Sequence, residues 1–139
     1  QHAAGIKIPK TGTVFISVRE PDKTKALVKL ARLLIKKGFL IIATEGTSEF
    51  LNLNNIKSSY INKVHQGQPH IVDLIRKGEI DLIINTTEGK QSIEESFSIR
   101  AEAVIRDVTY YTSLEASIAT MDAFDYFNMV SVNRLQDFY

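Results

Sequence analysis

The chain has 139 residues, a length that suits one globular domain with a substantial core. Hydrophobic residues make up 44% and charged residues 24%, and the net charge of +1 gives no bulk electrostatic reason to expect a nucleic-acid or anionic-membrane partner. Cysteine is absent, which excludes disulfides, thiol catalysis and cysteine-based zinc sites, and the longest apolar runs are far shorter than the ~20 residues of a membrane-spanning helix.

The first eleven residues differ in character from the rest of the chain. They contain Gly5 and Pro9, follow no clear periodicity and lack the apolar segment of a signal peptide. We therefore expect residues 1–11 to be a linker from a preceding domain and residues 12–139 to form one domain. The lack of cysteine fits a reducing compartment, and we expect a cytoplasmic protein.

From residue 12 onward the pattern alternates between strand and helix. Runs rich in β-branched, aliphatic and aromatic residues predict strands at residues 13–18, 39–43, 59–62, 80–84 and 110–111, with a further edge strand at 129–132. Apolar residues at helical spacing predict helices at 22–37, from the turn at 44–48 through Leu53, at 71–77, at about 92–106 and at about 114–124. In the helix at 92–106 the expected apolar face consists of Ile93, Phe97, Ile99, Ala103 and Val104.

These elements predict the fold class. Strands that are apolar on both faces and separated by helices indicate a parallel sheet that is covered on both sides. We therefore predict an α/β fold, a three-layer sandwich with a sheet of about five mainly parallel strands.

Polar side chains follow four of the predicted strands. Ligands of open α/β sheets bind beyond the carboxyl ends of the strands, so these residues are candidates for a binding site. Hydroxyl, amide and ammonium groups outnumber carboxylates there, a mixture that suits phosphate. The residues that follow the strands are Ser17, Arg19, Glu20, Asp22, Lys23, Thr44, Gly46, Thr47, Ser48, Lys63, Asn85, Thr86 and Thr87.

Two of these positions have simpler explanations as well. The turn at 44–48 places free N–H groups and Gly46 at a helix start, but Thr47 or Ser48 as an ordinary N-cap is the better explanation of that segment alone. Lys23 in the first turn of a helix costs about 0.3–1 kcal/mol, which a bound anion would offset, although a solvated side chain or the adjacent Asp22 would do so too.

The histidines do not suggest a metal site. His65 and His70 do not have the spacing of helical zinc ligands, and we interpret them as loop or surface residues and expect no metal. The chain also lacks the GxSxG, GxGxxG and phosphate-binding-loop motifs.

Four segments together resemble a known family. They are FISVREPDK, FLIIATEGTSEFL, INKVHQGQPHIVDLIRKGEIDLIINTTEGKQSIEESFSIR and YYTSLEAS, in residues 15–117. They resemble the C-terminal regulatory domain of the bacterial carbamoyl phosphate synthetase large subunit, of the methylglyoxal-synthase-like superfamily, and the similarity runs from about Gly12 to about Val132. The resemblance implies a Rossmann-like fold and a domain that is regulatory and not catalytic.

The resemblance also implies ligands and partners. The domain would bind nucleotide monophosphates, with UMP inhibiting and IMP activating the synthesis of carbamoyl phosphate from bicarbonate, glutamine and ATP for pyrimidine and arginine biosynthesis. Tyr110 and Thr112 match the family's ornithine site at the boundary with the neighbouring synthetase domain. Eight residues match its phosphate and ribose contacts, and the resemblance therefore implies a nucleotide site at Ser17, Lys23, Thr44, Thr47, Lys63, Asn85, Thr86 and Thr87. The partners would be the synthetase domains and the small glutaminase subunit. The domain itself would need no cofactor, and the parent enzyme would use ATP with Mg or Mn.

The sequence departs from the family at three points. Gln91 follows Lys90 where a second basic residue is common, and Ala101 follows Arg100 where a second arginine is common. Glu45 lies inside the predicted phosphate turn and must point away from the ligand. An interaction domain with no nucleotide site is therefore one alternative.

The second alternative is a methylglyoxal synthase. This lyase needs a carboxylate base. In this chain Gln68 follows Gly67 where that enzyme has an aspartate, and Asn85 to Thr87 follow the fourth strand where it has its other acid. We therefore expect a binding domain and no lyase activity.

Overall fold

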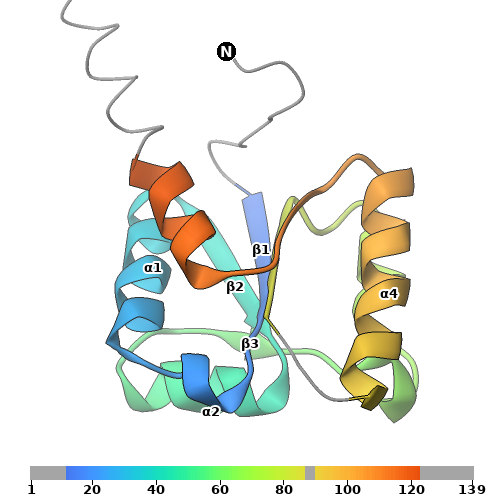
Figure 1. Cartoon of the computed structure of the whole chain (residues 1–139), viewed down its shortest axis with the longest axis horizontal. Helices are drawn as coiled ribbons and strands as arrows, with labels where there is room; N and C mark the ends of the chain where they lie inside the picture. The colour runs from blue at the N-terminus through green and yellow to red at the C-terminus, as the bar shows by residue number, and fades with distance from the viewer. Residues whose placement is uncertain (1–11, 87–89, 123–139) are drawn as a thin grey trace, which may run out of the picture.

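A computed structural model of the chain describes residues 12–86 and 90–122, with the side chains of 90–93 left aside. Its centre is a five-stranded sheet in the order β3-β2-β1-β4-β5 (Figure 1). All four strand pairs are parallel, which confirms the predicted α/β class. The strands are β1 Gly12–Ser17, β2 Phe39–Ala43, β3 Ser59–Tyr60, β4 Leu82–Asn85 and β5 Thr109–Tyr111.

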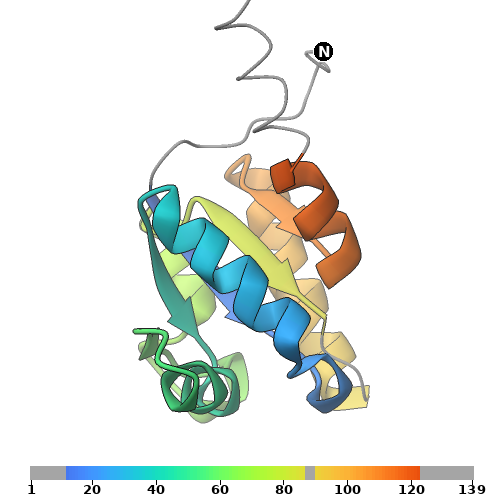
Figure 2. The same ribbon diagram turned by 90° about the vertical axis from the view of Figure 1, so that its left-hand side faces the viewer.

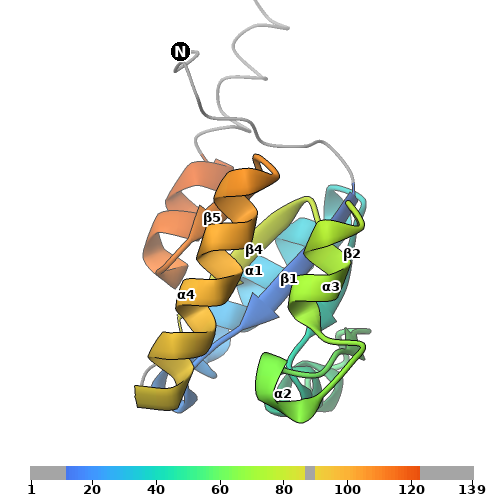
Figure 3. The same cartoon turned by 90° about the vertical axis from the view of Figure 1, so that its right-hand side faces the viewer.

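Helices cover both faces of the sheet and complete the three layers. The helix α1, Lys25–Lys36, and the helical residues 114–122 lie on one face (Figure 2), and α3, Ile71–Arg76, and α4, Lys90–Ile105, lie on the other (Figure 3). The helix α2, Glu45–Leu53, lies at the end of the molecule to which the strands point (Figure 1). Two short 3-10 turns, η1 at Glu20–Asp22 and η2 at Val64–Gln66, complete the connections.

The strand β1 is the central strand of the sheet, so the residues at its carboxyl end lie between those of β2 and β4. It pairs with β2 on one side and β4 on the other, with Ile16 opposite Ala43 and Ser17 opposite Asn85. Phe15 and Ile16 are fully buried in the two layers of core on either face. This register brings the residues after β1, β2 and β4 to one edge of the sheet.

The amino end of β1 requires a glycine. Gly12 has a φ of +144°, and a Cβ atom there would lie 2.2 Å from Oδ2 of Asp81. The same carboxylate accepts a hydrogen bond of 2.8 Å from the backbone N–H of Thr13. Close approach of Asp81 therefore fixes the start of the strand.

A buried carboxylate joins the two helices of the α3–α4 layer. Glu102 on α4 accepts hydrogen bonds from Nε of Arg76, at 3.1 Å, and from Nε of Arg106, at 3.3 Å. The bond from Arg76 has the largest effect on the pKa of Glu102. Together the two bonds hold that pKa below its ordinary value, although burial alone would raise it.

The structure corrects the bounds of two predicted elements, and two others lie outside the described residues. The first helix was expected from residue 22, but it begins at Lys25 because Glu20–Asp22, with Pro21 near its start, forms the separate turn η1. The third strand was expected to reach Asn62 and ends at Tyr60, and Asn62 makes only an isolated bridge to His70. The linker at 1–11 and the strand at 129–132 lie outside the described residues.

The fourth helix also corrects the predicted apolar face. Ile99 and Ala103 are buried against the sheet, whereas Phe97 and Val104 are 74% and 75% exposed. At 100° per residue the helix cannot turn all four toward the sheet, and the expectation for Phe97 and Val104 was therefore wrong.

Candidate functional site

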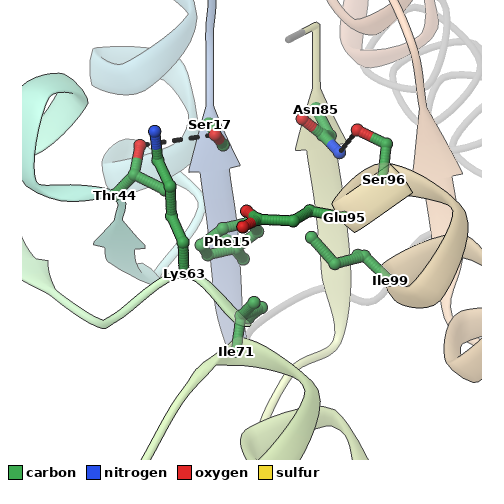
Figure 4. A pocket seen from close by; sticks show the side chains of 9 residues that line it. All are labelled: Phe15, Ser17, Thr44, Lys63, Ile71, Asn85, Glu95, Ser96 and Ile99. Carbon is green, nitrogen blue, oxygen red and sulfur yellow. Dashed lines mark hydrogen bonds between the residues drawn. The ribbon is translucent and has the colours of Figure 1, made fainter. Parts of the chain in front are cut away.

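A hollow opens at the carboxyl ends of β1, β2 and β4, on the side covered by α3 and α4 (Figure 4). Its volume is about 280 Å³, counted with the solvent-open space above it. Four of the eight predicted site residues line it, which are Ser17, Thr44, Lys63 and Asn85. The other lining residues are Phe15, Ile71, Glu95, Ser96 and Ile99.

Hydroxyl groups join the ends of β1 and β2 beside the hollow. The Thr44 hydroxyl lies 3.3 Å from Oγ of Ser17 and 3.1 Å from Oγ1 of Thr47 and donates its one proton to either of them. Oγ1 of Thr47 also accepts a bond of 3.2 Å from the backbone N–H of Val18. Thr47 therefore has a structural bond of its own with Val18, whereas the Ser17 hydroxyl can accept from Thr44 and still has its own proton to donate.

The first turn of α2 leaves backbone donors beside this cluster. Thr44 is the N-cap residue of α2, but its side chain makes no capping bond. The simpler explanation of this turn, an N-cap at Thr47 or Ser48, is therefore wrong. The N–H groups of the first helical residues have no intrahelical acceptor, and the positive end of the helix dipole lies there. Glu45 is exposed and lines a separate groove with Glu49 and Tyr60, so its carboxylate lies outside the hollow.

The two candidate lysines have different surroundings. Lys63 lines the hollow from the loop after β3, and Thr44 lines it too (Figure 4). Within residues 12–86 and 90–122 no ion pair involves Lys63.

Lys23 is instead paired with the carboxylate of Glu20. It lies before the first turn of α1, so the predicted dipole penalty does not apply, and Asp22 pairs with Arg19 at 2.9 Å. The Lys23 ammonium occupies the space that Gly46 leaves open, since a Cβ atom on Gly46 would lie 3.1 Å from it. Lys23 therefore lies next to the turn of α2 but does not line the hollow.

The end of β4 connects the hollow to β5. The amide nitrogen of Asn85 donates to Oγ of Ser96 at 3.0 Å and to the hydroxyl oxygen of Tyr110 at 2.8 Å. Tyr110 therefore lies one hydrogen bond from the hollow, whereas Thr112 is exposed. Thr86 accepts a bond of 3.3 Å at its hydroxyl from the N–H of Arg19, and Thr87 lies outside the described residues.

Residues 26–112 match the family model of the MGS-like domain. The chain belongs to the MGS-like domain family. It is 44% identical to the carbamoyl phosphate synthase large chain of Xanthomonas axonopodis pv. citri over 99% of its length. It is 48% identical to the large chain of Myxococcus xanthus over 90% and 47% identical to that of Archaeoglobus fulgidus over 88%. The chain spans only 11–13% of the length of these relatives.

A solved structure supports the fold of this MGS-like domain. The crystal structure of methylglyoxal synthase from Elizabethkingia anophelis matches with a TM-score of 0.61 and 16% identity, over 82% of this chain and 78% of that one. At this identity the match bears on the fold, and it confirms the Rossmann-like sandwich.

The MGS-like domain also has a site residue that sequence reasoning missed. The Glu95 carboxylate points into the hollow from α4 (Figure 4) and is paired with Nδ1 of His65, whose backbone N–H also donates to it at 3.3 Å. Glu95 and Ser96 precede the buried Ile99 by about one turn, and knowing which face of α4 is buried would have identified them. A carboxylate here repels an anion placed directly beside it and accepts bonds from hydroxyl groups.

Two further observations concern the described residues. Among the described residues no group of three or more His, Asp or Glu side chains could hold a metal ion. No helix in the same part of the chain is long and apolar enough to cross a membrane.

Proposed function

We propose that this MGS-like domain is the regulatory module of a carbamoyl phosphate synthase large chain and binds a nucleoside monophosphate in the hollow. One observation carries the proposal: a lysine that makes no ion pair within residues 12–86 and 90–122 lines one hollow together with two hydroxyl groups and the N-cap residue of a helix, where three strands end. The similarity to carbamoyl phosphate synthase large chains over nearly all of this chain supports the proposed identity of the parent protein.

The phosphate would bind at the end of the hollow formed by β1, β2 and α2. The Ser17 hydroxyl and the Lys63 ammonium supply side-chain donors, and the first turn of α2 supplies backbone donors. Thr44 and Thr47 hold this end of the site together, and Lys23 adds a positive charge next to Gly46.

The rest of the hollow favours a nucleotide over inorganic phosphate. Glu95 offers carboxylate oxygens to hydroxyl donors, the role that acidic residues have toward ribose in dinucleotide-binding folds. Figure 4 shows its carboxylate in the middle of the hollow, where its pairing with His65 holds it. A ligand with both an anionic group and ribose hydroxyl groups would find a partner for each in the hollow, and UMP and IMP are the candidates that the family resemblance names.

The regulation would act on the parent enzyme. Ligand binding would favour one arrangement of the loops after β1, β2 and β4, and the synthetase domains would respond with a coupling free energy of about 1–3 kcal/mol. The parent would make carbamoyl phosphate from bicarbonate, glutamine and ATP with Mg or Mn, together with a small glutaminase subunit. Ornithine would bind near Tyr110, whose hydroxyl already contacts Asn85.

Calorimetric titration of the chain tests the proposal. We expect UMP or IMP to bind more tightly than inorganic phosphate, and phosphate more tightly than uridine, which has no phosphate group. Binding to the folded state must also raise the melting temperature. If neither nucleotide at millimolar concentration binds or raises the melting temperature, the proposal is wrong.

The lyase remains the alternative, because Glu95 places one carboxylate in the hollow. We expect no methylglyoxal from dihydroxyacetone phosphate, since Glu95 is already paired with His65 and the end of β4 has Asn85 in place of an acid. Turnover by the wild-type chain that is lost in Glu95→Gln would support the lyase instead.

A further inference from the structure

The helix α4 has apolar residues on two opposite faces. Its inner face lines the hollow through Glu95, Ser96 and Ile99. Its outer face has four apolar residues at helical spacing, i, i+4, i+7 and i+8. We call Phe97, Ala101, Val104 and Ile105 the α4 outer face.

Solvent covers most of this surface. Phe97, Val104 and Ile105 are 74%, 75% and 70% exposed, and Ala101 between them is exposed too. Single exposed apolar residues are ordinary, but a run of them along three turns of one helix marks a surface that another protein segment covers. Figures 1 and 3 show α4 on the outside of the molecule, on the opposite side of the sheet from α1 and residues 114–122.

We propose that the α4 outer face is the docking surface for another domain of the same parent chain. This inference rests on the proposed function, because it takes the parent to be a large chain. The relatives are many times longer than this chain, which spans 13% of the one from Xanthomonas, so most of such a protein lies outside the structure.

The size of the surface favours a tethered partner. Specific interfaces between separate molecules use about 20–30 residues a side, far more than four residues on one helix supply. A domain on the same chain is held at an effective concentration in the millimolar range, and a small apolar contact is then enough. A second copy of the chain would need a larger patch.

Arg100 connects the docking surface to the nucleotide site. It lies on α4 between Phe97 and Val104, and its guanidinium carbon is 4.9 Å from the centre of the Tyr110 ring. The Tyr110 hydroxyl in turn accepts the hydrogen bond from Asn85 in the hollow. A partner seated on the outer face would therefore contact the same helix that lines the ligand on its inner face.

Cysteine labelling tests the docking surface, because the chain has no cysteine of its own. Phe97→Cys is made in this chain alone and in the full-length large chain, and modification by a maleimide is followed by mass spectrometry of the tryptic peptide 91–100. We expect modification at least tenfold slower in the large chain. The matched control is Leu53→Cys on α2, which is 77% exposed and should react at the same rate in both within twofold.

Three results would overturn the proposal. The first is equal rates for Phe97→Cys in both proteins. The second is a rate in the isolated chain that falls as its own concentration rises, because this would identify a second copy as the occupant. The third is that Val104→Cys, used if Phe97→Cys lowers the melting temperature, is labelled equally in both. Nucleotide affinity of the isolated chain is measured separately, so that a failed docking surface and a failed nucleotide site are distinguished.

Discussion

Replacing Lys63 by glutamine is the most direct test of the phosphate site. The side chain is half-buried, makes no ion pair within the described residues and lines the hollow together with Ser17 and Thr44. A hydrogen bond to a charged group contributes about 1.5–3 kcal/mol, which corresponds to about 10- to 150-fold in affinity. Because Lys63 is partly exposed, we expect the lower part of this range for Lys63→Gln in a calorimetric titration with UMP.

The control for this experiment removes the same charge at the other end of the sheet. Lys77 follows α3 and lines a groove with Asp81 at the amino ends of the strands. At 0.15 M salt the Debye length is about 8 Å, and Lys77→Gln should change UMP affinity less than twofold. The assignment of Lys63 fails if both variants weaken binding equally, or if Lys63→Gln binds as tightly as the wild type.

Three further predictions concern stability. Thr47→Val leaves the buried N–H of Val18 without its acceptor and should lower the free energy of unfolding in urea by about 1–3 kcal/mol, whereas Thr47→Ser should restore most of it. Gly12→Ala places a methyl group against Asp81 at a positive φ and should lower the free energy of unfolding in urea. A loss of unfolding free energy smaller than about 1 kcal/mol would contradict the close approach of Asp81 to Gly12. The pKa of Glu102 is lowered in the folded state. The stability that its charge contributes is therefore complete above the ordinary pKa of 4.5 and is lost as the pH falls below that value. Glu102→Gln should show a smaller drop in melting temperature between pH 6 and pH 3 than the wild type.

The sequence predicted the sheet and the position of several residues that line the hollow, because both follow from strong local patterns. The apolar runs at 39–43 and 80–84 indicate buried parallel strands, and the edge rule for such sheets then brings Ser17, Thr44 and Asn85 together. This part of the prediction needed no knowledge of side-chain contacts.

The remaining errors arise where local and tertiary effects compete. A 3-10 turn around Pro21 delays α1 to Lys25, and only the folded turn shows that Glu20, and not Asp22, pairs with Lys23. In α4 the apolar residues lie on both faces, and the sequence could not show which of them faces the sheet. For that reason Phe97 was placed in the core and Glu95 was not recognised as part of the hollow.

The lengths of the strands bear on how this domain can associate with other proteins. The three inner strands have six, five and four residues, whereas the outermost described strands, β3 and β5, have two and three. An outer strand of two or three residues has few unpaired backbone groups with which a strand of another molecule could pair. Short outer strands are one way in which proteins avoid edge-to-edge aggregation of their sheets. Within the described part of the chain, contacts to neighbours would therefore form through side chains on the helices, where they can be specific and reversible.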